Sequence, residues 1–212
     1  MSNLQKRREQ EKQERQDAIL DAAEKMFGEK GYDRTSMGDI ARTASLSRAL
    51  LYVYFKDKAA IQRSIILHAA ERLQERFRVA LDSEQMGLEK IKAVGQAYYR
   101  FWQEEPDYFE ALTKAPSAIQ EADDEEAREM IALELEKMQL MVEALEVGLK
   151  DGSIGGRLVK DPIQTALYLR GALHGVIMMC EQKMGEDGPL AKYPCDTLIH
   201  HTIEMLEQSL RT

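Results

Sequence analysis

The sequence predicts an all-α fold of about nine helices, in which a three-helix N-terminal domain with a helix-turn-helix precedes a larger C-terminal helical domain. Three observations support this prediction. Apolar residues recur at helical spacing along most of the 212 residues, residues of high helix propensity are abundant, and no segment shows the alternation of a strand. The five prolines all lie at or near expected helix boundaries, where a missing backbone N–H is tolerated.

The first helix is expected to begin at Arg15 and to end near Gly31. Gly31 suits the left-handed backbone that commonly ends a helix. Residues 1–14 are charged and lack an apolar stripe, so we expect a flexible arm there. The apolar face of the helix consists of Ala18, Ile19, Ala22, Ala23, Met26 and Phe27.

Two short helices are predicted next, over residues 37–44 and 48–55. Ser36 can cap the first of them, and Asp39 follows three residues later, which is the spacing of a capping box. Ser47 can cap the second helix. The starts of both helices are therefore encoded by residues next to them.

Longer helices are expected to form most of the remaining chain, with breaks that contain proline and glycine. The predicted segments are 59–81, 86–104, 107–114, 122–151, 162–184 and 194–210. We therefore divide the chain into the arm of residues 1–14, a helix-turn-helix domain over 15–58, and a larger helical domain over 59–212.

The block 35–55 meets the physical requirements of a helix-turn-helix. Ile40 and Leu51 can pack the two short helices together, while Ala41 and Ala44 are small enough for a close crossing. In such motifs the N-terminal residues of the second helix reach base edges in the major groove of DNA.

The charge is distributed unevenly along the chain. The 29 Lys and Arg and 37 Asp and Glu give a net charge of −8, which argues against a general polyanion binder. However, residues 1–60 hold 12 basic and 10 acidic side chains, whereas residues 61–212 hold 17 and 27. The small basic excess on the helix-turn-helix segment favours a nucleic-acid contact there.

Several other classes of protein are disfavoured. Cys180 and Cys195 are too few for a disulfide scaffold, and we expect both to be reduced, packed thiols. No apolar run is long enough to cross a bilayer, and the polar N-terminus lacks a signal peptide, so we expect a soluble cytoplasmic protein without a membrane partner. No catalytic, metal-binding or cofactor-binding pattern is recognised, which predicts a protein that is not an enzyme and carries no metal or cofactor.

The pattern from Ile19 to Lys58 is longer than a bare helix-turn-helix. It includes Phe27-Gly28-Glu29-Lys30-Gly31-Tyr32, Thr35-Ser36-Met37-Gly38-Asp39-Ile40-Ala41 and Leu51-Tyr52-Val53-Tyr54-Phe55-Lys56-Asp57-Lys58. This pattern resembles the DNA-binding domain of the TetR family of transcriptional regulators. Gly152-Ser153-Ile154, followed by Asp161-Pro162, also looks like the link between the family's seventh and eighth helices. Ser45, where the family usually has glycine, and Ala49-Leu50, where it often has Gly-Thr or Pro-Thr, depart from it.

The resemblance implies a set of DNA contacts. Arg48 would read guanine by a bidentate hydrogen bond, and Ala49 and Leu50 would contact thymine methyl groups. Hydroxyls and cations on the other positions would meet phosphate or sugar, although Tyr52 and Tyr54 could equally be part of a hydrophobic cluster. Lys6-Arg7-Arg8 would either reach a minor groove or form a solubilising tail. The expected contacts are Thr35, Ser36, Arg42, Ser47, Arg48, Ala49, Leu50, Tyr52, Tyr54 and Lys58.

The resemblance also implies that residues 59–212 bind an effector and dimerise through the last two helices. For the effector, the candidates are Tyr98, Trp102, Tyr108, Phe109, Met138, Met141, Gly171, His174 and Met178. For the dimer interface, they are Gly175, Leu198, Thr202, Met205 and Leu206. The alternative is that the methionines and aromatics are ordinary core residues.

The leading hypothesis is therefore a homodimeric, ligand-responsive regulator, a repressor that a small lipophilic effector releases from a palindromic operator in double-stranded DNA. One alternative is a helical carrier or small enzyme that acts on an apolar small molecule without specific DNA binding. Another is an adaptor whose acidic surface binds a protein.

Overall fold

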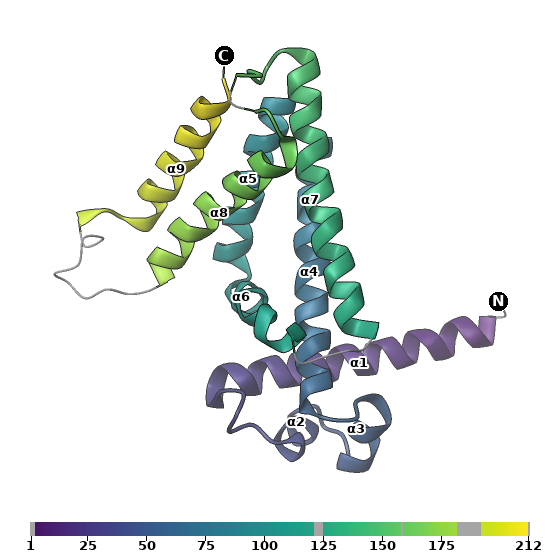
Figure 1. Cartoon of the computed structure of the whole chain (residues 1–212). Coiled ribbons are helices and arrows are strands. Elements are labelled where there is room, and N and C mark those ends of the chain that lie inside the picture. Colours follow the sequence, from purple (N-terminus) through teal and green to yellow (C-terminus); the bar gives the residue numbers. More distant parts are fainter. Residues whose placement is uncertain (1–2, 121–124, 158, 182–191, 212) are drawn as a thin grey trace. The chain divides into compact units, whose positions relative to one another are not determined.

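The computed structural model describes residues 3–120, 125–157, 159–181 and 192–211 (Figure 1). Within these ranges the chain forms nine α-helices and no strand, which confirms the predicted fold class. None of the described helices is long and apolar enough to cross a membrane. The helices are α1 (Asn3–Lys30), α2 (Met37–Thr43), α3 (Arg48–Tyr54), α4 (Lys58–Asp82), α5 (Gly87–Glu104), α6 (Pro106–Gln120), α7 (Glu125–Asp151), α8 (Pro162–Glu181) and α9 (Cys195–Leu210).

Backbone contacts divide the chain into two compact units. Unit 1 comprises residues 1–70 and 107–130, and unit 2 comprises residues 71–106 and 131–212. Both α4 and α7 contribute to the two units, so neither unit is a single continuous stretch of chain.

The larger apolar core of unit 1 receives side chains from α1, α2, α3 and α4. The expected packing of Ile40 against the second short helix is confirmed, because Ile40 and Leu51 are both completely buried in this core. Tyr108 and Ala111 of α6 pack against the same core. Periodicity alone could not reveal this, because it shows which face of α6 is apolar but not which core that face covers.

Two residues with positive φ set the connections in unit 1. Gly31 (φ 80°) follows α1 as the sequence predicts, and its N–H donates to the carbonyl of Phe27 at 2.9 Å. Ser45 (φ 57°) makes the turn between α2 and α3, and it is the one non-glycine residue with a positive φ in the described chain. The turn is closed by a 2.8 Å hydrogen bond from the Leu46 N–H to the Ala41 carbonyl.

The N-terminal segment differs from the expectation of an arm over residues 1–14. The structure begins α1 at Asn3, so the helix starts about four turns before the apolar stripe at Ala18. Side chains four residues apart support it, through Arg7 to Glu11 at 3.0 Å and Gln10 to Glu14 at 3.1 Å. The predicted helix start at Arg15 was therefore too late, because a charged segment without an apolar stripe can be helical when it continues a buried helix.

Unit 2 has its own core, which includes the completely buried Phe101, Leu145, Ile177 and Ile199. Helix α9 packs on both α8 and α5. The start of α5 lies against the end of α7, where a Cβ on Gly87 would come within 2.0 Å of the Gly148 nitrogen. Glycine is therefore required at this crossing.

The ends of α6 and α8 differ from the predicted helix ends or are only partly described. The sequence predicts a helix over 107–114 that stops before Pro116, but α6 continues to Gln120. A proline within a helix removes one backbone hydrogen bond, and this loss does not end α6. Of the helix predicted over 162–184, the structure confirms 162–181, and the last three residues lie outside the described ranges.

Candidate DNA-binding and effector sites

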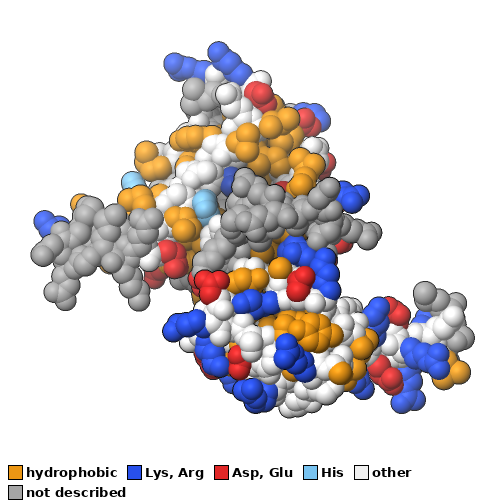
Figure 2. Space-filling view, turned by 60° about the horizontal axis from the view of Figure 1, so that its bottom comes forward, with side chains coloured by type: hydrophobic (Ala, Val, Ile, Leu, Met, Phe, Trp, Pro, Cys, Tyr) orange, Lys and Arg blue, Asp and Glu red, His pale blue; other side chains and the backbone are white. Residues whose placement is uncertain are grey.

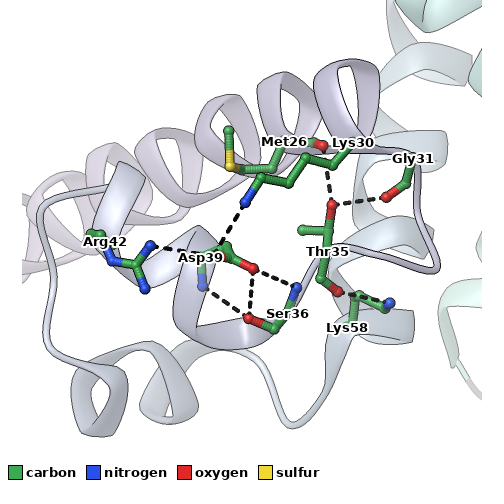
Figure 3. Close-up of polar contacts among 8 residues, drawn as sticks. All are labelled: Met26, Lys30, Gly31, Thr35, Ser36, Asp39, Arg42 and Lys58. Atoms are coloured by element: carbon green, nitrogen blue, oxygen red, sulfur yellow. Dashed lines mark hydrogen bonds and ion pairs between the residues drawn. The ribbon is translucent and has the colours of Figure 1, made fainter.

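The capping box predicted at the start of α2 is present. The Ser36 hydroxyl accepts from the Asp39 N–H at 3.2 Å, and the Ser36 N–H donates to the Asp39 carboxylate at 3.1 Å (Figure 3). The hydrogen bonds from the Ser36 hydroxyl and N–H, aided by the charge of Lys30, lower the pKa of Asp39 to about 2. Asp39 is therefore ionised, and it pairs with Lys30 at 3.4 Å and with the exposed Arg42 at 3.3 Å.

Two residues expected at phosphate, Thr35 and Lys58, are hydrogen-bonded within unit 1. Thr35 is 2% exposed, and its hydroxyl lies within hydrogen-bonding distance of the Met26 and Gly31 carbonyls, at 3.0 and 2.9 Å. The Lys58 ammonium donates to the Thr35 carbonyl at 2.9 Å (Figure 3). It also donates to the Tyr32 carbonyl at 2.6 Å and lies 4.2 Å from the Tyr32 ring centroid. Both side chains hold the connection between α1 and α2, a role that their chemical type alone did not reveal.

Helix α3 has one buried and one exposed face. Ser47 caps it as predicted, because its hydroxyl accepts from the Leu50 N–H at 3.1 Å. Leu51, within the helix, and Phe55, immediately after it, are buried in the core of unit 1. The opposite face carries exposed Arg48 and Ala49, and Leu50 is half-buried beside them.

Two side chains on the exposed face of α3, Arg48 and Tyr52, contact each other. Arg48 donates to the Tyr52 hydroxyl at 3.3 Å, and its guanidinium carbon lies 5.7 Å from the Tyr52 ring centroid. Tyr52 is 45% exposed, whereas Tyr54 is half-buried against the core of unit 1. Of the two tyrosines, Tyr52 is therefore the more exposed to solvent.

Val53 was not among the expected DNA contacts, yet it is 75% exposed on α3. Its position directly after Tyr52, on the same short helix, could have suggested this exposure. Figure 2 shows Lys and Arg side chains around an apolar patch in the part of the view where the helix-turn-helix comes forward. An apolar surface bordered by cations has the chemistry to contact base edges with its apolar part and phosphates with its cations.

Among the effector candidates, the structure joins Tyr98 and His174. The Tyr98 hydroxyl and His174 Nδ1 share a 2.7 Å hydrogen bond between α5 and α8. Burial raises the pKa of Tyr98 and, together with the charge of Arg170, lowers the pKa of His174, so both side chains are held neutral. Trp102 donates its indole N–H to the Glu181 carboxylate.

The other candidates are placed in several different environments. Tyr108 and Phe109 belong to unit 1, where Tyr108 packs against the core and Phe109 is buried. Met141 is buried in unit 2, and Met138 and Met178 are half-buried there. The nine candidates therefore do not all belong to one unit of the structure.

Gly171 belongs to an exposed stripe on α8 instead. It is exposed, as is Gly175, and open space surrounds the Cβ position of both. The members of this stripe are spaced four residues apart. The sequence shows this spacing, but the full stripe was not predicted from it. Its members are Ile163, Leu167, Gly171, Gly175 and Met179, all of which are exposed.

The remaining dimer candidates lie on α9. Met205 is 56% exposed, and Leu198, Thr202 and Leu206 are half-buried. The Thr202 hydroxyl donates to the Leu198 carbonyl at 2.8 Å, so it satisfies itself within the helix. Both of the last two helices of unit 2 therefore expose apolar side chains, α8 through its stripe and α9 through Met205.

The predictions about cysteines and metal sites can be checked only for the residues that the structure describes. Cys180 and Cys195 are half-buried thiols without a disulfide, as expected. Among the described residues, no group of three or more His, Cys, Asp and Glu side chains could hold a metal ion.

Comparison with sequence families gives two matches. Residues 19–65 match the family described as bacterial regulatory proteins of the tetR family. Residues 91–206 match the family described as the tetracyclin repressor-like C-terminal domain.

Individual relatives match over short stretches of the chain. The HTH-type transcriptional regulator AcrR of Shigella flexneri is 44% identical over 50 residues, which cover 24% of this chain and 23% of that protein. The biofilm operon negative transcriptional regulator IcaR of Staphylococcus aureus is 44% identical over 45 residues, covering 21% of this chain and 24% of IcaR. The matched stretch thus spans less than a quarter of either relative.

Solved structures match over nearly the whole chain. PfmR of Thermus thermophilus, a TetR family transcriptional regulator, has a TM-score of 0.70 at 25% identity, covering 90% of this chain and 97% of its own. FadR of Bacillus subtilis, solved in complex with stearoyl-CoA, has a TM-score of 0.69 at 19% identity, covering 92% and 98%. The second likeness concerns the fold alone.

Proposed function

The chain belongs to the TetR family of bacterial regulatory proteins, and we propose that it represses transcription by binding a palindromic operator in double-stranded DNA as a homodimer. One observation carries this proposal. The first residues of α3 are exposed while Leu51 anchors the helix in the core, which is the arrangement by which a recognition helix enters the major groove.

Within this proposal, Arg48 reads guanine and the apolar side chains beside it contact thymine methyl groups. Ser36 and Ser47 are exposed caps that can approach phosphate, and Arg42 adds a cation next to them. We leave Thr35 and Lys58 out of the contact set because their polar groups are already bonded within unit 1.

We assign the homodimer interface to α8 and α9. The exposed stripe from Ile163 to Met179 has two glycines at its centre, which allow another helix to approach closely. Apolar side chains left in water on two adjacent helices favour an interface of this kind. A dimer also brings two copies of α3 to one operator, with half-sites at least about one helical turn apart.

The proposed effector is a small lipophilic molecule that binds unit 2 and weakens DNA binding. The crystal structure of the Bacillus subtilis FadR, whose fold is similar, contains stearoyl-CoA. Effector and operator affinities would then be coupled reciprocally, typically by about 1–3 kcal/mol.

The decisive experiment is sequencing the DNA that the purified protein selects from a random pool. We expect an inverted repeat whose retardation in a gel falls steeply as salt rises, because phosphate contacts release counterions. No enrichment, together with no retardation at low salt, would favour the alternative of a helical carrier or enzyme without specific DNA binding. Enrichment of an asymmetric sequence would contradict the homodimeric arrangement.

A further inference from the structure

Three charged side chains meet between α7 and α8 in unit 2. Lys137 Nζ donates to one oxygen of the Glu134 carboxylate at 2.6 Å. Arg170 Nη1 lies 2.7 Å from the other oxygen of the same carboxylate. Lys137 is only 5% exposed, whereas the Arg170 side chain is about half exposed. One carboxylate therefore serves two cations, of which one is buried.

The charge balance of this cluster is incomplete. An ammonium has three N–H donors, and Glu134 is the one acceptor for Lys137 among the described residues. Burial lowers the pKa of Lys137, since a charge removed from water is costly unless it is fully paired. Although burial opposes it, the charges of Lys137 and Arg170 hold the pKa of Glu134 below its usual value, so the carboxylate is ionised.

The pair formed by Tyr98 and His174 lies in the same neighbourhood. Arg170 and His174 are four residues apart on α8, so their side chains share a face. The positive charge of Arg170 acts on the pKa of both Tyr98 and His174, and the negative charge of Glu134 acts on Tyr98 as well. Three helices thus bring two cations, one anion and two neutral hydrogen-bonding side chains together.

We propose that Tyr98, Glu134, Lys137, Arg170 and His174 form a subsite for a single anionic group, a carboxylate or a phosphate, on an otherwise apolar effector. This inference rests on the proposed function, which places the effector in unit 2. The anion would compensate the positive charge that Glu134 leaves unbalanced. It would also accept the unused N–H bonds of Lys137 and the guanidinium of Arg170, as charge-assisted hydrogen bonds.

The competing explanation is an ion pair that only joins α7 to α8. The two explanations differ in what they predict about ligand charge. A structural ion pair gives no preference between compounds that share an apolar chain, whereas a cationic subsite prefers an anion over a neutral or cationic compound. The preference for charge, rather than stability or affinity alone, is therefore the quantity to measure.

The experiment titrates the purified full chain with decanoate, decyl phosphate, decanol and decyltrimethylammonium. Trp102 is the single tryptophan in the sequence, and it stands one helical turn after Tyr98, so its fluorescence reports binding in this region. We expect the preferred anion to bind at least about tenfold more tightly than decanol, and decyltrimethylammonium to bind most weakly. The ranking of the two anions distinguishes a carboxylate effector from a phosphate effector.

Substitutions at the three charges have opposite expected effects. Lys137→Met and Arg170→Met should each reduce the ratio of anion to decanol affinity by about tenfold. Glu134→Gln should increase that ratio, because it removes the anion that competes with the ligand. The matched control is Lys92→Met, since Lys92 pairs with the buried Glu207 at 2.9 Å elsewhere in unit 2, and its loss should leave the ratio unchanged.

The ratio compares ligands on one variant, so a general loss of stability does not imitate the expected result. Absence of an anion preference in the wild type, including failure of both anions to bind, would overturn the proposal. An unchanged preference in Lys137→Met would overturn it as well. If the protein binds its selected DNA and decanol releases it as well as decanoate does, the subsite is wrong while the proposed function stands. Failure to bind DNA would instead contradict the proposed function.

Discussion

The ammonium of Lys58, at the first residue of α4, donates to the carbonyl oxygen of Thr35 at 2.9 Å, across 23 residues of sequence. The same ammonium donates to the Tyr32 carbonyl at 2.6 Å and lies over the Tyr32 ring. Lys58 therefore attaches α4 to the connection that precedes the helix-turn-helix. A cation placed in this way stabilises the connection between α1 and α2.

Replacement of Lys58 by methionine should lower the free energy of unfolding by about 1–3 kcal/mol, because backbone carbonyls lose a charged donor. Urea unfolding measures this change. The slope of log affinity for DNA against log salt should stay the same, whereas loss of a phosphate ligand would reduce it by about one. A reduced slope with unchanged stability would return Lys58 to the DNA interface.

Replacement of Arg48 by alanine should weaken binding to the selected operator by about 1–3 kcal/mol and relax the sequence preference at one position per half-site. A quantitative mobility-shift assay with base-substituted operators measures both effects, and sedimentation should show an unchanged oligomeric state. Arg100→Ala removes an exposed arginine from α5 and serves as the control. Equal loss of affinity in both variants would exclude a base-reading role for Arg48.

The pKa of Asp39, lowered to about 2 from its usual 3.8, makes stability depend on acid pH. A carboxyl with a depressed folded-state pKa contributes stability above its unfolded-state value and loses it as the pH falls through the folded-state value. Asp39→Asn should therefore destabilise the protein near neutral pH, and the difference from wild type should shrink between pH 3.8 and about 2. Urea unfolding at several pH values tests this, and a pH-independent difference would contradict it.

Replacement of Leu167 by glutamate should place a charge in the middle of the proposed dimer interface. We expect the dimer dissociation constant to rise by at least about tenfold, since an unpaired charge in an interface costs more than it would in water. Analytical ultracentrifugation measures it. Gln164→Glu changes an exposed polar residue on the same helix and should have no comparable effect. A dimer that withstands Leu167→Glu would move the interface away from α8.

Local features of unit 1 were predicted well because their causes are local. A cap, a capping box and a glycine with positive φ each depend on a few neighbouring residues, and Ser36, Ser47 and Gly31 all behave as their sequence context indicates. The start of α1 was predicted too late for a related reason, since absence of an apolar stripe does not prevent an existing helix from continuing.

The sequence by itself determined the all-α class, the helix-turn-helix and the family to which the chain belongs, because helical period, caps and motif spacing are properties of neighbouring residues. Only the tertiary structure decided which polar side chains are already bonded within the protein. In the tertiary structure, Thr35 and Lys58 bond to backbone carbonyls of unit 1. Lys137 and Arg170 both contact the carboxylate of Glu134. The physical reason is that hydrogen bonds and charge compensation between distant segments depend on where helices cross, and the spacing within one helix carries no information about its partner.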